Sequence, residues 1–104
     1  MGIHAQMGQH IYLQILIILE NKPGALARVV GLFHQRGYNI ASLHVDAVED
    51  VSQYSWLENN LSINLKPNEV SEMTISTTVS DTLLTQILRQ INKLIDVLYA
   101  EEKI

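Results

Sequence analysis

The chain contains no cysteine, and this absence removes several classes of function at once. Without thiols there is no disulfide-bonded scaffold, no zinc site built on thiolates and no cysteine nucleophile. The absence also fits a reducing compartment, so we expect a cytoplasmic protein.

Positive charge and long apolar runs are also scarce. Seven Lys and Arg residues face eleven Asp and Glu, which gives a formal net charge of −4. Nucleic acids and anionic membranes bind basic surfaces, so we expect neither as a partner. The longest apolar run, residues 15–19, is too short to span a bilayer. No basic segment followed by a long apolar stretch opens the chain, so we expect no secretion signal.

Motifs of catalysis and metal binding are missing as well. The glycines are spaced too widely for a phosphate-binding or dinucleotide-binding loop. The histidines have no metal-ligand spacing: His4, His10, His34 and His44. Ser42, His44 and Asp46 share one strand face, but neighbours two residues apart project in parallel and do not form a catalytic relay. A small enzyme is therefore disfavoured, because no acid–base pair or nucleophile can be identified.

What the sequence does contain is a regular succession of apolar patterns. With 104 residues and 47 % hydrophobic content, it has enough material for one domain with a core. Alternating apolar residues predict strands over 10–20, 39–48, 73–79 and 95–99. Apolar residues at helical spacing predict one helix from Leu26 to Phe33, capped by Gly37, and another from Leu84 to Leu94, with Ser80 as an N-cap candidate. We expect Gly31 to allow close packing of the first helix on the sheet.

This order predicts an α+β fold of the ferredoxin-like βαββαβ type, a four-stranded antiparallel sheet with two helices on one face. We expect residues 1–9 to form a flexible N-terminal tail and residues 10–104 to form a single domain. Residues 49–71 form an insertion between the second and third strands. Because Leu61, Ile63 and Leu65 alternate with polar residues, we expect a hairpin or an extra strand there.

Three stretches resemble the ACT domain, and more narrowly the small regulatory subunit of acetolactate (acetohydroxyacid) synthase. They are residues 19–26 (LENKPGAL), 30–40 (VGLFHQRGYNI) and 88–97 (LRQINKLIDV). Members of that family usually join the two middle strands by a short loop, and residues 49–71 depart from this pattern.

The resemblance implies a non-catalytic regulatory subunit that gives valine feedback control of branched-chain amino acid biosynthesis. It implies a homodimer formed by edge-to-edge pairing of two ACT domains, with a branched-chain amino acid, most simply valine, at the interface. It further implies a catalytic large subunit as partner. The cofactors thiamine diphosphate, Mg²⁺ and FAD would belong to that partner, and this chain would hold none.

The candidate ligand site has a physical basis beside the resemblance. A glycine turn that leads into a helix exposes unpaired backbone N–H groups, and the helix dipole adds positive charge, so the turn suits a carboxylate. We expect Gly24, Ala25 and Leu26 to supply these donors, and Asn21 and Asn39 to bind the ligand's ammonium group. The full candidate set is Asn21, Lys22, Pro23, Gly24, Ala25, Leu26, Asn39 and Ile40. The same residue types also commonly form turns, which leaves a purely structural role open.

A second hypothesis comes from the insertion. In this alternative the chain is a stand-alone ACT interaction module, and the inserted hairpin binds another protein through Tyr54, Trp56 and Leu57. Trp56 has a competing explanation, which is packing within the insertion.

Overall fold

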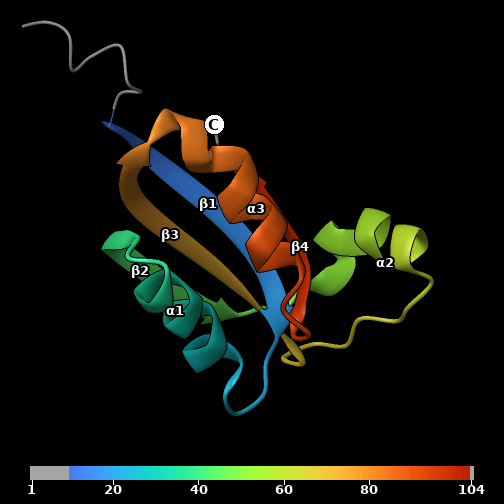
Figure 1. Cartoon of the computed structure of the whole chain (residues 1–104). Helices are drawn as coiled ribbons and strands as arrows, with labels where there is room; N and C mark the ends of the chain where they lie inside the picture. The colour runs from blue at the N-terminus through green and yellow to red at the C-terminus, as the bar shows by residue number, and fades with distance from the viewer. Residues whose placement is uncertain (1–9, 104) are drawn as a thin grey trace, which may run out of the picture.

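A computed structural model describes residues 10–103 (Figure 1). The expected tail, residues 1–9, lies outside the described residues. Four antiparallel strands form one sheet in the order β2-β3-β1-β4: β1 (His10–Glu20), β2 (Asn39–Ala47), β3 (Val70–Ser80) and β4 (Val97–Glu102). The central strands β1 and β3 pair along their full length, from His10 opposite Ser80 to Glu20 opposite Val70. β2 and β4 are therefore the two edges of the sheet.

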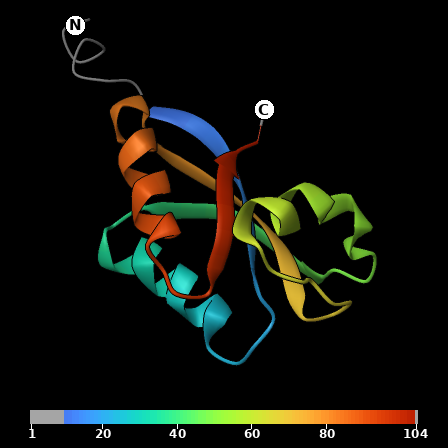
Figure 2. The ribbon, with the colours of Figure 1, turned by 90° about the vertical axis from the view of Figure 1, so that its right-hand side faces the viewer.

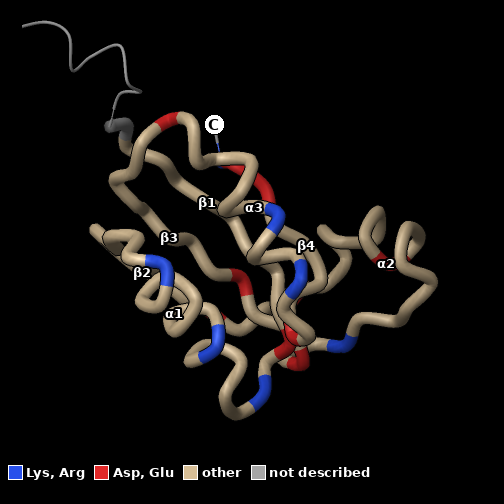
Figure 3. The backbone as a smooth tube through the Cα atoms, in the orientation of Figure 1, with Lys and Arg blue, Asp and Glu red and all other residues tan. Residues whose placement is uncertain are grey.

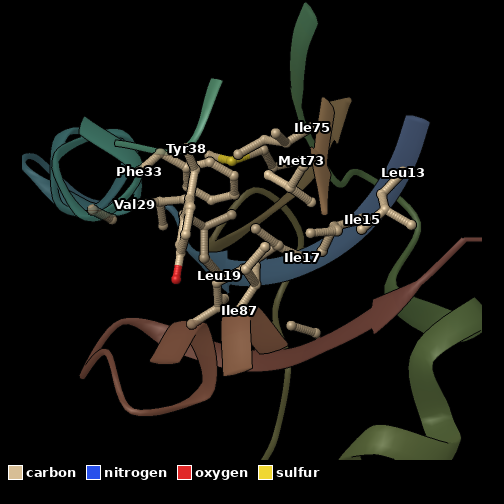
Figure 4. Close-up of a cluster of buried hydrophobic side chains, with 14 residues drawn as sticks. Leu13, Ile15, Ile17, Leu19, Val29, Phe33, Tyr38, Met73, Ile75 and Ile87 are labelled. Carbon is tan, nitrogen blue, oxygen red and sulfur yellow. The ribbon is translucent and has the colours of Figure 1, made fainter. Parts of the chain in front are cut away.

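The main core lies between one face of the sheet and two helices, α1 (Ala25–Gln35) and α3 (Leu84–Asn92). Val29 and Phe33 of α1 and Ile87 of α3 are fully buried against the sheet (Figure 4). The sheet side chains below them come from alternate positions of β1 and β3: Leu13, Ile15, Ile17, Leu19, Met73 and Ile75. This arrangement confirms the predicted ferredoxin-like fold with two helices on one face.

The end of α1 is fixed by glycine and by an aromatic contact. Gly37 has φ +71°, and the N–H of Tyr38 donates to the carbonyl of Phe33 at 2.9 Å, which closes a left-handed C-terminal cap as predicted. The Tyr38 ring packs edge-on against Phe33, with 5.8 Å between centroids, and its hydroxyl donates to Gln90 of α3. Gly31 is different: no atom lies within 4 Å of where its Cβ would be, so the expectation of close packing there was wrong.

The last strand begins later than the alternation predicted. Val97 is the first residue of β4, whereas Ile95 is 83 % exposed in the preceding turn. The turn is closed by the N–H of Val97 donating to Leu94, and the carbonyl of Asp96 accepts from the N–H of Glu20 at 2.8 Å. Asp96 thus lies next to the end of β1.

Residues 48–69, here called the β2–β3 segment, are helical rather than extended. They contain a 3₁₀ turn, η2 (Val51–Tyr54), followed by α2 (Ser55–Leu61) and an irregular return to β3. The predicted hairpin or extra strand was wrong because the amides of the return segment bond to α2. The Ile63 N–H donates to the Glu58 carbonyl and the Leu65 N–H to the Glu58 carboxylate.

The β2–β3 segment covers the face of the sheet opposite α1 and α3. Figure 2 shows α2 on the far side of the sheet from those two helices. A second apolar cluster joins it to the sheet: Ile18, Val48, Tyr54, Leu57, Leu65 and Val70. Ile18 adjoins Ile17 in β1, so the two apolar faces of β1 serve the two clusters. Within residues 10–103, no helix combines the length and apolar character needed to cross a membrane.

Candidate functional site

The loop between β1 and α1 is held in one conformation by backbone hydrogen bonds and a glycine. The N–H of Asn21 donates to the carbonyl of Glu69 at 2.8 Å, and the N–H of Ala25 donates to the carbonyl of Lys22 at 3.2 Å. Gly24 has φ +87°, a left-handed conformation that residues with a Cβ rarely adopt. Pro23 and Gly24 are both exposed, so the turn faces solvent.

The first turn of α1 leaves backbone donors unused. The Ala25 amide is taken by Lys22, contrary to its predicted role as a ligand donor. The amides of Gly24, Leu26 and Ala27 have no acceptor among residues 10–103. The helix begins without a side-chain cap and without an acidic residue in its first turn. Its partial positive charge is therefore uncompensated, which suits a carboxylate.

Asn21, at the start of the same loop, has one half of its side chain already engaged. Its Nδ2 donates to the carbonyl of Asn68 at 2.8 Å. This bond orients the amide and leaves its oxygen without a donor among the described residues; that this oxygen accepts from an ammonium group stays a prediction. The contact comes from the β2–β3 segment and was not foreseen from the sequence.

A buried carboxylate anchors the loop from below. Asp96 is only 1 % exposed and forms ion pairs with Arg28 of α1 and, at 3.4 Å, with Lys22 of the loop. The hydrogen bond from Arg28, supported by Lys22, holds the pKa of Asp96 below its usual range against the opposing effect of burial. In Figure 3, basic and acidic positions gather at this end of the sheet, between α1 and the return from α2.

Lys22, within the loop, and Arg28, on α1, make contacts that the sequence did not predict. Lys22 also pairs with Glu20 at 2.5 Å, so it bridges two carboxylates rather than standing free in solvent. The Arg28 guanidinium lies over Gly24, where an added Cβ would be 2.8 Å from Nη1. The only available signal was Asp96 itself, a charged residue within the apolar stretch 94–98.

Asn39 and Ile40 lie at the other end of the sheet from the loop. Asn39 pairs opposite Thr78 on β3, whereas Glu20 pairs opposite Val70, eight residues away on the same strand. At about 3.3 Å per residue this is roughly 26 Å, too far for one small ligand. The structure therefore brings together residues 21–26 within one chain but not Asn39 and Ile40.

β2 is an exposed edge strand of nine residues. Its polar side chains Ser42, His44 and Asp46 face solvent as predicted, and His44 Nε2 lies 2.8 Å from Asp46 Oδ2. One edge of its backbone pairs with β3, and no described residue pairs with the other. Such an edge is a template for pairing with another strand.

The aromatic residues of the β2–β3 segment mostly pack inward. Tyr54 and Leu57 are buried, which removes two of the three residues on which the interaction-module hypothesis relied. Trp56 is 41 % exposed, and its ring packs edge-on against Tyr99 of β4 at 4.9 Å between centroids. In the described part of the chain, no group of three or more His, Cys, Asp or Glu side chains could hold a metal ion.

Solved structures place this fold in a known class. The chain superposes with a TM-score of 0.65 on the ACT domain of GTP pyrophosphokinase from Chlorobium tepidum, at 16 % identity, covering 91 % of this chain and all of that one. It also superposes with a TM-score of 0.65 on the acetolactate synthase small subunit of Thermotoga maritima, at 25 % identity, covering 88 % of this chain and 47 % of that one. The fold is that of an ACT domain.

The sequence narrows the class to one family. Residues 15–99 match the family model described as the AHAS small subunit-like ACT domain, and the chain belongs to that family. The Escherichia coli acetolactate synthase isozyme 3 small subunit is 42 % identical over 86 residues, covering 83 % of this chain and 42 % of that protein. The Mycolicibacterium smegmatis acetolactate synthase small subunit is 40 % identical over 87 residues, covering 84 % of this chain and 41 % of that protein. The chain thus spans less than half the length of these relatives.

Proposed function

We propose that this chain is an amino-acid-sensing regulatory subunit that acts on the catalytic large subunit of acetolactate synthase. The observation that carries the proposal is the first turn of α1, where three amides have no acceptor in the described part of the chain, with Asn21 in the loop that leads into it. A zwitterion would place its carboxylate on those amides and its ammonium on the Asn21 oxygen. The relatives named acetolactate synthase small subunit support this role.

The ligand site is completed by a second copy of the chain. β2 ends opposite Ser71, next to the end of β1 and the start of α1. Antiparallel pairing of two β2 edges would bring the start of one copy's β2 to this end of the other. Asn39 and Ile40 of the second copy would then approach residues 21–26, and the interface would hold two equivalent ligands.

The regulatory effect follows from where the ligand would bind. A molecule that bridges two copies stabilises one arrangement of the dimer by its difference in affinity between arrangements. Valine, with a short aliphatic side chain, is the ligand we expect. Thiamine diphosphate, Mg²⁺ and FAD are expected in the large subunit, and the complex is expected in the cytoplasm.

The test is reconstitution with the large subunit from the same organism. We expect the chain to co-elute with it, to raise the rate of acetolactate formation, and to make that rate sensitive to millimolar valine. The matched variant Asn21→Ala should still co-elute and activate but lose the valine response. No association and no change in rate would contradict the proposal.

A further inference from the structure

The β2–β3 segment forms a pocket with the end of β1, on the side of the loop away from α1. Its volume is about 490 Å³, within the range of small-molecule sites. Its apolar lining includes Leu65, Val70 and Leu98, and its polar rim includes Lys66 and Glu69 of the return from α2 together with Asn21 and Lys22 of the loop. This pocket, here called the segment pocket, lies within a single chain.

The pocket is held open by fixed backbone. Glu58 accepts the Leu65 amide at 2.8 Å, which ties one wall to α2. The Asn68 N–H donates to the carbonyl of Val48 at 2.8 Å, and the Asn68 carbonyl accepts from Asn21. Anchored at both ends, the wall does not need a ligand to form.

The rim offers two unengaged charges of opposite sign. Glu69 donates its N–H to the carbonyl of Lys66 at 3.1 Å, and Asn68 between them has φ +64°, so residues 66–69 form a tight turn. Neither the Lys66 nor the Glu69 side chain takes part in an ion pair in the described part of the chain. By contrast, Lys22 is already neutralised by Glu20 and Asp96.

From this combination we propose that the segment pocket binds a free amino acid with a large apolar side chain, in addition to the ligand proposed at the dimer interface, with which it shares the loop residues Asn21 and Lys22. Lys66 receives the carboxylate, Glu69 receives the ammonium group, and the side chain rests on Leu65, Val70 and Leu98. A zwitterion satisfies both charges, whereas a simple anion or cation would leave one of them facing a like charge. The site needs no second copy of the chain.

The experiment is calorimetric titration of leucine into the chain and into Leu43→Lys, which places a charge on the β2 edge to prevent pairing. Sedimentation of the variant checks that it is monomeric before the titration. We expect one leucine per chain in Leu43→Lys, in which the interface site is not formed. Lys66→Gln and Glu69→Gln should each weaken binding about tenfold or more, the loss of one charge-assisted contact. The exposed controls Lys93→Gln and Glu49→Gln should bind as the parent does.

Two ligand analogues test the chemistry without changing the protein. 4-Methylpentanoate lacks the ammonium group and 3-methylbutylamine lacks the carboxylate, and both should bind at least about tenfold more weakly than leucine. Leucine binding that is lost in Leu43→Lys, or that is unchanged in Lys66→Gln and Glu69→Gln, would overturn the segment pocket while leaving the interface site intact. Failure of leucine, isoleucine, methionine and phenylalanine to bind at millimolar concentration would overturn it as well. Binding that persists in the monomer would support it even if the large subunit does not respond.

Discussion

At the scale of single residues, the glycine just before α1 and the glycine within α1 have opposite requirements. Gly24 has φ +87°, and an added Cβ would meet the Arg28 guanidinium, whereas a Cβ on Gly31 would meet nothing within 4 Å. We expect Gly24→Ala to lower the free energy of unfolding by about 1–2 kcal/mol, the strain of a left-handed residue. Gly31→Ala should raise it by about 0.5–1 kcal/mol, because alanine favours the helix.

Urea unfolding followed by circular dichroism measures both glycine variants under one set of conditions. If Gly24→Ala does not lower the unfolding midpoint, the strain assigned to the left-handed Gly24 is wrong; if Gly31→Ala does not raise it, the open space assigned to Gly31 is wrong. Gly24→Ala should also weaken valine binding, since the turn places the amides of Gly24 and Leu26.

Asp96 predicts a dependence of stability on pH. Its folded-state pKa lies below the ordinary value of about 3.9, because Arg28 and Lys22 stabilise the carboxylate. The resulting stabilisation is present above about pH 4 and disappears as pH falls through the lower folded-state pKa. We expect Asp96→Asn to melt at a lower temperature than the parent at pH 7, with a gap that narrows from about pH 4 downward. A gap of constant size from pH 7 to pH 3 would contradict this account.

The sequence predicted the turn between β1 and α1 but not the contacts that hold it in place. Asn21, Pro23 and Gly24 stand together in a turn that leads into an amphipathic helix, so local chemistry was enough to predict the turn, and the family resemblance proposed it as a ligand site. Asp96 is 68 residues from Arg28 in the chain and meets it only after the sheet has formed. Because the Arg28–Asp96 contact joins residues far apart in the chain, no periodic pattern in the sequence indicates it.

At the scale of elements, α2 behaves as a cover for the second face of the sheet. Leu57 is buried in the second cluster, whereas Leu61 on the same helix is exposed. We expect Leu57→Ala to lower the free energy of unfolding by about 2–4 kcal/mol, because it opens a cavity under the helix. Leu61→Ala should change it by less than about 0.5 kcal/mol.

Thermal or chemical unfolding of the two leucine variants provides the comparison, and hydrogen exchange shows where the loss falls. Exchange should accelerate first in residues 51–65 of Leu57→Ala, since those amides depend on α2. Equal stability of Leu57→Ala and Leu61→Ala would mean that the helix does not pack on the sheet.

The elements with long apolar patterns were predicted from the sequence, whereas the short helical elements of the β2–β3 segment were not. The helices α1 and α3 and the strands β1 and β3 are each nine or more residues long. In the β2–β3 segment, Leu61, Ile63 and Leu65 alternate as in a strand, but Glu58 captures the amides that a strand would need. Local hydrogen bonds from these amides to Glu58 outweigh the strand preference of three alternating apolar residues.

At the scale of the whole molecule, the candidate site is divided between the two ends of the sheet. Residues 21–26 lie at one end of β1, and Asn39 lies at the opposite end of β2. The exposed β2 edge is the surface through which a second copy would join them. The fold was predictable from one chain. The proposed shared site stays a prediction, because residues 21–26 and Asn39 are apart within one chain and would meet only across two copies.

The most direct measurement mixes two variants that are each defective in one half of the site. In a Lys66→Gln background that silences the segment pocket, neither Asn21→Ala nor Asn39→Ala should bind valine in calorimetric titration. A mixed dimer has one site with both defects and one intact site. An equimolar mixture, after exchange of subunits, should therefore recover about one quarter of the parent's binding capacity. A mixture that binds no more than its components, or full binding by Asn39→Ala alone, would contradict a site shared between two copies.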